Sequence, residues 1–117
     1  MATAYALRIF KGLIAKMTAV MDYKSLTDEE LAQMAYADSL SAFLELFERY
    51  KGNIKIWCQG YYSCDIDYDF MMQQGLVGLY VAIRDYKQLE SGLFRNFANM
   101  CIRRQVMAAA NHIQHPK

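Results

Sequence analysis

The stretch DYDFMMQQGLVGLYVAIRDYK, residues 67–87, decides the fold. Its apolar residues return every three or four positions, which is the period of an amphipathic helix. The apolar face comprises Met71, Val77 or Gly78, Leu79, Ala82, Ile83 and Tyr86. Asp65, Asp67 and Asp69 gather at the start, where negative charge suits the positive end of a helix dipole. We predict a helix over about 67–86 that buries one face in a core.

Two further stretches carry the same period on either side. A helix over about 39–62 would place an aromatic and apolar stripe in the core, comprising Phe43, Phe47, Tyr50, Ile54, Trp57 and Tyr61. A helix over about 93–113 carries Phe94, Phe97, Cys101, Ile102, Val106 and Ala109. The loop KQLESG joins it to the helix before, with Gly92 as a natural break.

A short helix opens at Thr27, which forms a capping box with Glu30. Leu26 and Leu31 are spaced for a hydrophobic staple around that cap. The helix breaks near the sequence ADS, where Asp38 or Ser39 can cap the next helix.

Residues 4–21, AYALRIFKGLIAKMTAVM, form another amphipathic pattern with basic residues on the polar face. An acid-poor stretch of this kind is compatible with a presequence or a membrane-surface helix. With one arginine and no serine, it is better interpreted as a helix packed on the domain or on a partner. We therefore divide the chain into an N-terminal amphipathic helix, 1–24, and a helical domain, 25–117.

Composition agrees with an all-α fold. The chain has 117 residues, 55% of them hydrophobic, which suits one globular domain with one core. Its single proline is Pro116, and valine and threonine are few. We expect a compact bundle of four to five helices. Three cysteines make no disulfide framework, and no apolar run is long enough to span a bilayer, so we expect a reducing, cytoplasmic location.

The sequence does not match the residue spacing of common metal-binding, phosphate-binding or catalytic motifs. DIDYDF, 65–70, lacks the glycine and glutamate of a calcium-binding EF-hand, with Phe70 and Leu76 at those positions. Zinc ligands drawn from Cys58, Cys64, His112 and His115 would have unusual spacings. QQGLVGL lacks the lysine of a phosphate-binding loop, and no nucleophile–histidine signature is present. We predict no metal, no cofactor and no enzyme activity.

The charge is divided unevenly along the chain. Nine basic and twelve acidic residues precede position 91, whereas four basic residues and no acidic residue follow it. Within FRNFANMCIRRQV, residues 94–106, Phe94 and Phe97 precede Arg103 and Arg104. Rings that stack on bases and arginines that contact phosphate are typical of nucleic-acid binding. Ordinary solvated arginines on a helix remain the alternative.

Two stretches together carry a family resemblance. DYDFMMQQGLVGLYVAIRDYK (67–87) followed by FRNFANMCIRRQVMAA (94–109), with SLSAFLELFERYKGNI (39–54) upstream, resembles region 2 of the sigma-70 family of bacterial RNA polymerase sigma factors. The likeness covers about residues 27–113 and is greatest to sigma-H-type alternative factors. It implies a helical domain that binds the coiled coil of the largest subunit of core RNA polymerase. It also implies recognition and melting of the −10 promoter element through its single-stranded non-template strand.

The resemblance assigns residues to each surface. The polymerase-binding residues would be Asp69, Phe70, Gln73, Gln74, Leu76 and Tyr80. The DNA-binding residues would be Phe94, Phe97, Arg103, Arg104, Met107 and Asn111. Phe94 is the best candidate for meeting a base, whereas Phe97 could equally be core. Arg103 could instead pair with Asp85 or Asp69, and Gly75 and Gly78 could allow polymerase to approach closely.

Departures from the family pattern modify these expectations. Phe70 and Gln74 stand where aspartate and glutamate are usual, which predicts weaker or altered polymerase binding. Met100 and Cys101 stand where primary factors have a tryptophan pair, which predicts weaker strand opening. The short chain suggests an excised domain or a factor that needs a separate partner for −35 recognition, with residues 4–21 as its docking helix. An anti-sigma factor is a further possible partner. The alternative function is a sigma-like interaction module, a regulator or decoy without promoter binding.

Overall fold

The structure, a computed structural model, describes residues 6, 8, 22–61, 67–87 and 92–114. Within this part of the chain it contains four α-helices, one 3-10 turn and no strand. The elements are η1 (Tyr23–Ser25), α2 (Asp28–Tyr36), α3 (Leu40–Gln59), α4 (Tyr68–Asp85) and α6 (Phe94–Gln114). The predicted all-α fold is confirmed. The predicted helix at 4–21 lies outside the described residues, except for positions 6 and 8.

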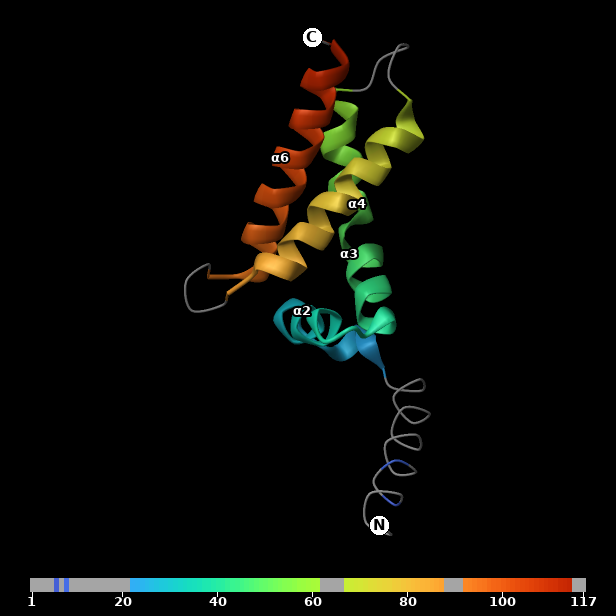
Figure 1. Ribbon diagram of the computed structural model, residues 1–117, viewed down its shortest axis with the longest axis vertical. Helices are drawn as coiled ribbons and strands as arrows, with labels where there is room; N and C mark the ends of the chain where they lie inside the picture. The colour runs from blue at the N-terminus through green and yellow to red at the C-terminus, as the bar shows by residue number, and fades with distance from the viewer. Residues whose placement is uncertain (1–5, 7, 9–21, 62–66, 88–91, 115–117) are drawn as a thin grey trace.

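The three long helices α3, α4 and α6 pack side by side (Figure 1). α3 and α6 run in the same direction, and α4 runs in the opposite direction and crosses in front of α3 (Figure 1). The short helix α2 lies across the end of the bundle where α3 and α6 begin and α4 ends (Figure 1). α2 is therefore placed to fix the start of α6.

Side-chain caps start the first three α-helices. Thr27 and Glu30 form the predicted capping box at α2, with each side chain accepting the other residue's backbone N–H. Ser39, rather than Asp38, caps α3 by accepting the N–H of Ala42 at 3.2 Å. Asp67 caps α4 by accepting the N–H of Asp69 at 2.9 Å. The acidic stretch thus starts a helix, as predicted.

The core follows a four-residue spacing along α3. Its buried residues are Ala42, Leu46, Tyr50, Ile54 and Cys58. Only Tyr50 and Ile54 belong to the predicted stripe, and the remaining aromatic residues of that stripe flank the core half-buried. The difference arises because α3 packs against α2, α4 and α6. A buried line with four-residue spacing drifts around a helix of 3.6 residues per turn, so it leaves the predicted stripe.

Glycines bring the helices of the core close together. A Cβ atom on Gly78 would lie 2.6 Å from the Cα of Ile102 on α6, and one on Gly75 would lie 2.2 Å from Cγ2 of Ile54 on α3. Val77 is exposed and Gly78 is buried, which settles the alternative in the predicted apolar face. Both glycines face neighbouring helices of the same chain, so the expectation that they admit polymerase is wrong.

In the described part of the chain, no helix is both long and apolar enough to cross a membrane. No group of three or more acidic, histidine or cysteine side chains among these residues could hold a metal ion. Cys58 and Cys101 are buried free thiols, and burial raises the pKa of each.

Candidate nucleic-acid interface

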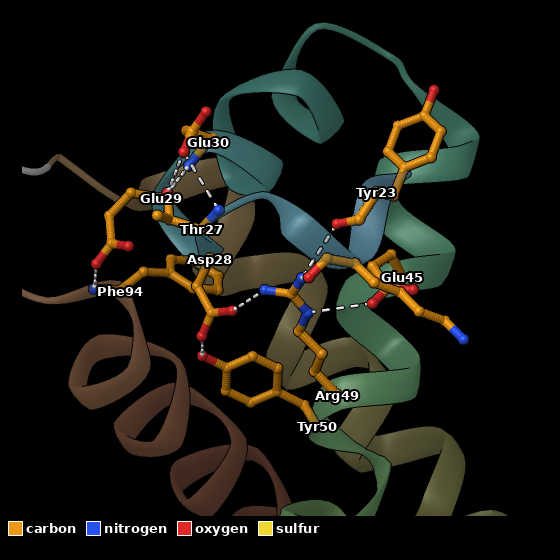
Figure 2. Close-up of polar contacts among 10 residues, drawn as sticks. Tyr23, Thr27, Asp28, Glu29, Glu30, Glu45, Arg49, Tyr50 and Phe94 are labelled. Carbon is orange, nitrogen blue, oxygen red and sulfur yellow. Dashed lines mark hydrogen bonds and ion pairs between the residues drawn. The ribbon is translucent and has the colours of Figure 1, made fainter. Parts of the chain in front are cut away.

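A polar network joins α2 to α3 and so fixes the position of the acidic residues on α2. Arg49 donates to Asp28 at 2.7 Å and to Glu45 at 3.2 Å, and its remaining nitrogen donates to the carbonyls of Tyr23 and Lys24 (Figure 2). The hydroxyl of Tyr50 donates to the other carboxylate oxygen of Asp28. Burial first, and then the Asp28 carboxylate, raises the pKa of Tyr50 well above its usual value.

The start of α6 is held against this network. The carboxylate of Glu29 on α2 accepts the backbone N–H of Phe94, the first residue of α6, at 3.2 Å (Figure 2). This contact satisfies an N–H that has no partner within the helix and places negative charge at the positive end of the helix dipole.

The side chain of Phe94 is buried in the core of the domain. Its side chain is 0% exposed and lies edge-on between the rings of Tyr50 and Tyr86, with centroid distances of 5.9 Å and 5.1 Å. A base cannot reach this ring, so the prediction that Phe94 meets unpaired DNA is wrong for this structure. The physical reason is the packing of Tyr50 from α3 and Tyr86 from the end of α4 against the Phe94 ring.

Phe97 lies half-buried one turn further along α6. Its ring tilts against that of Tyr86 at 5.9 Å, and the hydroxyl of Tyr86 donates to the carbonyl of Gly92 before α6. Gly92 has a φ of +73°, which a residue with a side chain adopts only at a cost. Phe97 therefore packs against the core and keeps part of its surface in solvent.

The outer face of α6 gathers the other predicted DNA-binding residues. Arg103, Arg104 and Asn111 are exposed, and Met107 is half-buried. Together with Met100 and Ala108 they line one shallow hollow. α6 contains no acidic residue, so the hollow carries positive charge without a carboxylate from its own helix.

Among the described residues, no ion pair joins Arg103 to Asp85 or Asp69, its two predicted acidic partners. Asp85 pairs instead with Arg84, and that hydrogen bond lowers the pKa of Asp85. The guanidinium of Arg103 lies over the indole ring of Trp57 on α3, 5.4 Å from its centroid. Beside this pair, the amide of Asn53 donates to the side-chain oxygen of Asn99 at 3.1 Å and joins α3 to α6.

The sequence interpretation missed this contribution from α3. Trp57 belonged to a stripe assigned to the core, and helical period alone does not separate the middle of such a stripe from its edge. Two features pointed to it: Trp57 is the only tryptophan, and residues 49–61 contain no acidic side chain.

The outward face of α4 presents most of the residues predicted to bind polymerase. Asp69, Phe70, Gln73 and Tyr80 are exposed, with Phe70 at 37% and Tyr80 at 56%, and Leu76 is half-buried. Gln74 differs, because its side-chain oxygen accepts a hydrogen bond from the Gln105 amide on α6 at 2.8 Å. Gln74 thus joins two helices of this chain through its side-chain oxygen.

The fold and these surfaces define a helical domain with a basic face on α6 and, on α4, an outward face on which Phe70, Val77 and Tyr80 are exposed. The sequence is 30% identical over 84 residues to the RNA polymerase sigma-H factors of Bacillus licheniformis and Bacillus subtilis (strain 168). The match covers 72% of this chain and 38% of each relative, so the chain spans well under half of their length. No family model matches the sequence. No solved structure matches it. The similarity over these residues makes the chain a sigma factor region of the sigma-70 family.

Proposed function

We propose that this chain is the promoter-contacting region of a sigma-type transcription initiation factor. It binds core RNA polymerase through α4, and it recognises and opens the −10 promoter element through α6. It carries out no chemical reaction and works in the cytoplasm, where polymerase and promoter DNA meet. The names of its relatives support an initiation role, and the observation that carries the proposal is the acid-free outer face of α6.

The face of α6 suits an unpaired strand. Arg103 and Arg104 supply phosphate contacts whose strength falls with salt, and Asn111 supplies hydrogen-bonding groups for a base edge. Phe97 offers the exposed part of its ring for stacking. Met100 is exposed and Cys101 is buried at the positions of the family's tryptophan pair, so base capture there is weaker than in primary sigma factors.

The face of α4 suits a protein partner. Phe70, Val77 and Tyr80 form a row of exposed large side chains at helical spacing, and Asp69 and Gln73 lie beside them. Aromatic residues in such rows supply most of the binding energy of protein interfaces. We assign this row, with Leu76 at its edge, to the coiled coil of the largest polymerase subunit.

The test is assembly of a three-component complex. Purified chain is mixed with Bacillus subtilis core polymerase and a forked DNA that carries a single-stranded −10-like element, and complexes are separated by size. The proposal predicts that the chain migrates with polymerase and increases its retention of the forked DNA over a fully duplex DNA. Absence of the chain from the polymerase fraction at low salt would contradict it.

A second function is favoured by one observation on α4. Gln74 faces α6, and Phe70 replaces a usual carboxylate, so two charges expected at the polymerase surface are missing. A sigma-like interaction module, acting as a regulator or decoy, would bind another protein through Phe70 and Tyr80. In the same experiment this function predicts no increase in the retention of forked DNA, whether or not the chain migrates with polymerase.

A further inference from the structure

A second hollow lies next to the basic face of α6, at its junction with α3. It is lined by Asn53, Ile56 and Trp57 of α3 and by Asn99 of α6. Ile56 is 65% exposed, although it is a large apolar residue in the last turns of α3. The hollow therefore combines two apolar side chains with two side-chain amides, and none of the residues that line it comes from α2 or α4.

The indole ring at this hollow is held in place. Arg103 lies over it at 5.4 Å, and an arginine above an indole face is an attractive arrangement worth most when it is partly desolvated. The ring is half-buried, so one part packs on the core and another part lines the hollow. A fixed aromatic surface loses little conformational entropy when a ligand stacks on it.

The two amides form a pair that retains hydrogen-bonding capacity. One N–H of Asn53 is donated to Asn99, which leaves the second N–H and the oxygen of Asn53 and the amide nitrogen of Asn99. These groups match the donors and acceptors on the edge of a nucleic-acid base. Asparagine side chains read base edges in this way in other protein–nucleic acid complexes.

The side chains around the hollow carry positive charge, which favours a negatively charged ligand. α3 has no acidic residue from Arg49 onward, and α6 has none along its whole length. Lys55 is exposed on α3, and Arg103 and Arg104 are exposed on α6. A polyanion that offers planar, uncharged bases fits this setting better than a protein surface that would need carboxylates at several points.

We propose that one unpaired base of a single-stranded nucleic acid stacks on Trp57 in this hollow. The base contacts Ile56 and the indole ring, its edge meets Asn53 and Asn99, and Arg103 holds the ring while its outward N–H groups contact the phosphate. The proposal rests on the proposed function and extends it, because it places a base-binding position on α3, outside the residues of α4 and α6 assigned above.

The single tryptophan makes the test direct. Its fluorescence is followed in the full chain during titration with a single-stranded 15-nucleotide oligomer and with the same oligomer carrying abasic sites. Binding is measured in parallel by fluorescence anisotropy of the labelled oligomers. We expect the base-bearing oligomer to quench the tryptophan and the abasic oligomer to leave it largely unchanged.

Three variants complete the test. Trp57→Leu should weaken binding of the base-bearing oligomer by about tenfold and should remove its advantage over the abasic oligomer. Trp57→Phe, which keeps a ring, should restore most of that advantage. Tyr36→Leu, at an exposed aromatic residue on α2 away from the hollow, should bind like the unaltered chain.

The outcomes separate the inference from the proposed function. Normal binding by Trp57→Leu, or equal quenching by both oligomers, overturns the base site and leaves the proposed function intact. Absence of binding by any oligomer at low salt contradicts both. A tryptophan signal that responds to core polymerase and to no oligomer assigns the hollow to a protein partner and overturns the proposal.

Discussion

The carboxylate of Glu29 accepts the backbone N–H of Phe94 and so links the first turn of α2 to the first residue of α6. The two residues are 65 positions apart in the sequence. Asp28, the neighbour of Glu29, is held by Arg49 and Tyr50 of α3. The starting point of the helix with the basic face is therefore set by an acidic turn that is itself fixed to α3.

Replacing Glu29 with alanine should destabilise the chain by about 1 kcal/mol, since the N–H of Phe94 loses its acceptor and the helix dipole loses a nearby negative charge. Glu29→Gln keeps an acceptor oxygen and should lose less. Urea unfolding followed by circular dichroism measures both. Equal stability of Glu29→Ala and the unaltered chain would show that the contact contributes nothing.

The two glycines Gly78 and Gly52 should respond to alanine in opposite directions. At Gly78 the added methyl meets the backbone of α6, so we expect a loss of about 1–3 kcal/mol in unfolding free energy. At Gly52, in the exposed middle of α3, nothing lies within 4 Å, and alanine should add about 0.5–1 kcal/mol. Thermal unfolding of both variants is the measurement, and a stable Gly78→Ala would contradict the close approach of α4 and α6.

Stability should fall at high pH because of Tyr50. Burial, followed by the Asp28 carboxylate, raises its pKa in the folded chain, so the unfolded chain releases this proton near pH 10 while the folded chain keeps it. The unfolded state then binds fewer protons, and the free energy of unfolding decreases as the pH rises above about 10. The buried thiols of Cys58 and Cys101 act in the same sense from about pH 9.

Tyr50→Phe isolates the tyrosine contribution. At pH 7 it should cost about 1 kcal/mol, because the hydrogen bond to Asp28 is lost while Arg49 still pairs with that carboxylate. Above pH 10 its unfolding free energy should decline less steeply than that of the unaltered chain. Urea titrations at pH 7, 9 and 11 measure the two slopes, and parallel slopes would refute the assignment.

Tyr80 should matter for polymerase and not for the fold. The side chain is exposed on α4, so Tyr80→Ser should change the unfolding free energy by less than about 0.5 kcal/mol. Loss of an aromatic residue from the centre of an interface should weaken binding to core polymerase by about tenfold or more. Tyr36→Ser is the matched control, and an equal effect of the two variants would remove α4 from the interface.

Much of the fold follows from local sequence signals. The capping box at Thr27 and the period along residues 67–86 act within a few helical turns, so the sequence alone predicts them. It also placed the caps of α3 and α4, and the structure identifies the capping residues as Ser39 and Asp67. The drift of the core line along α3 does not follow from period, because it depends on which helix contacts each turn. The same limit explains why Trp57, at the edge of the predicted stripe, was assigned to the core.

Only part of the candidate nucleic-acid interface could be predicted from the sequence, because spacing along one helix does not show which other helices pack against it. Arg103, Arg104, Met107 and Asn111 share one face of a single helix, which spacing predicts correctly. The burial of Phe94 depends on Tyr50 of α3, which is distant in sequence and packs against the Phe94 ring. The inward hydrogen bond of Gln74 likewise depends on Gln105 of another helix. Contacts of this kind require knowledge of how the helices pack.

Salt dependence of single-strand binding tests the nucleic-acid face of α6 most directly. Anisotropy of a labelled −10-like oligomer is measured at several salt concentrations for the unaltered chain, Arg104→Ala and the control Arg84→Ala, whose arginine pairs with Asp85 on α4. We expect tight binding at low salt, a linear fall of log affinity with log salt, and a slope reduced by about 0.7 in Arg104→Ala alone. Absence of low-salt binding, or identical slopes for all three proteins, would contradict a DNA-binding face on α6.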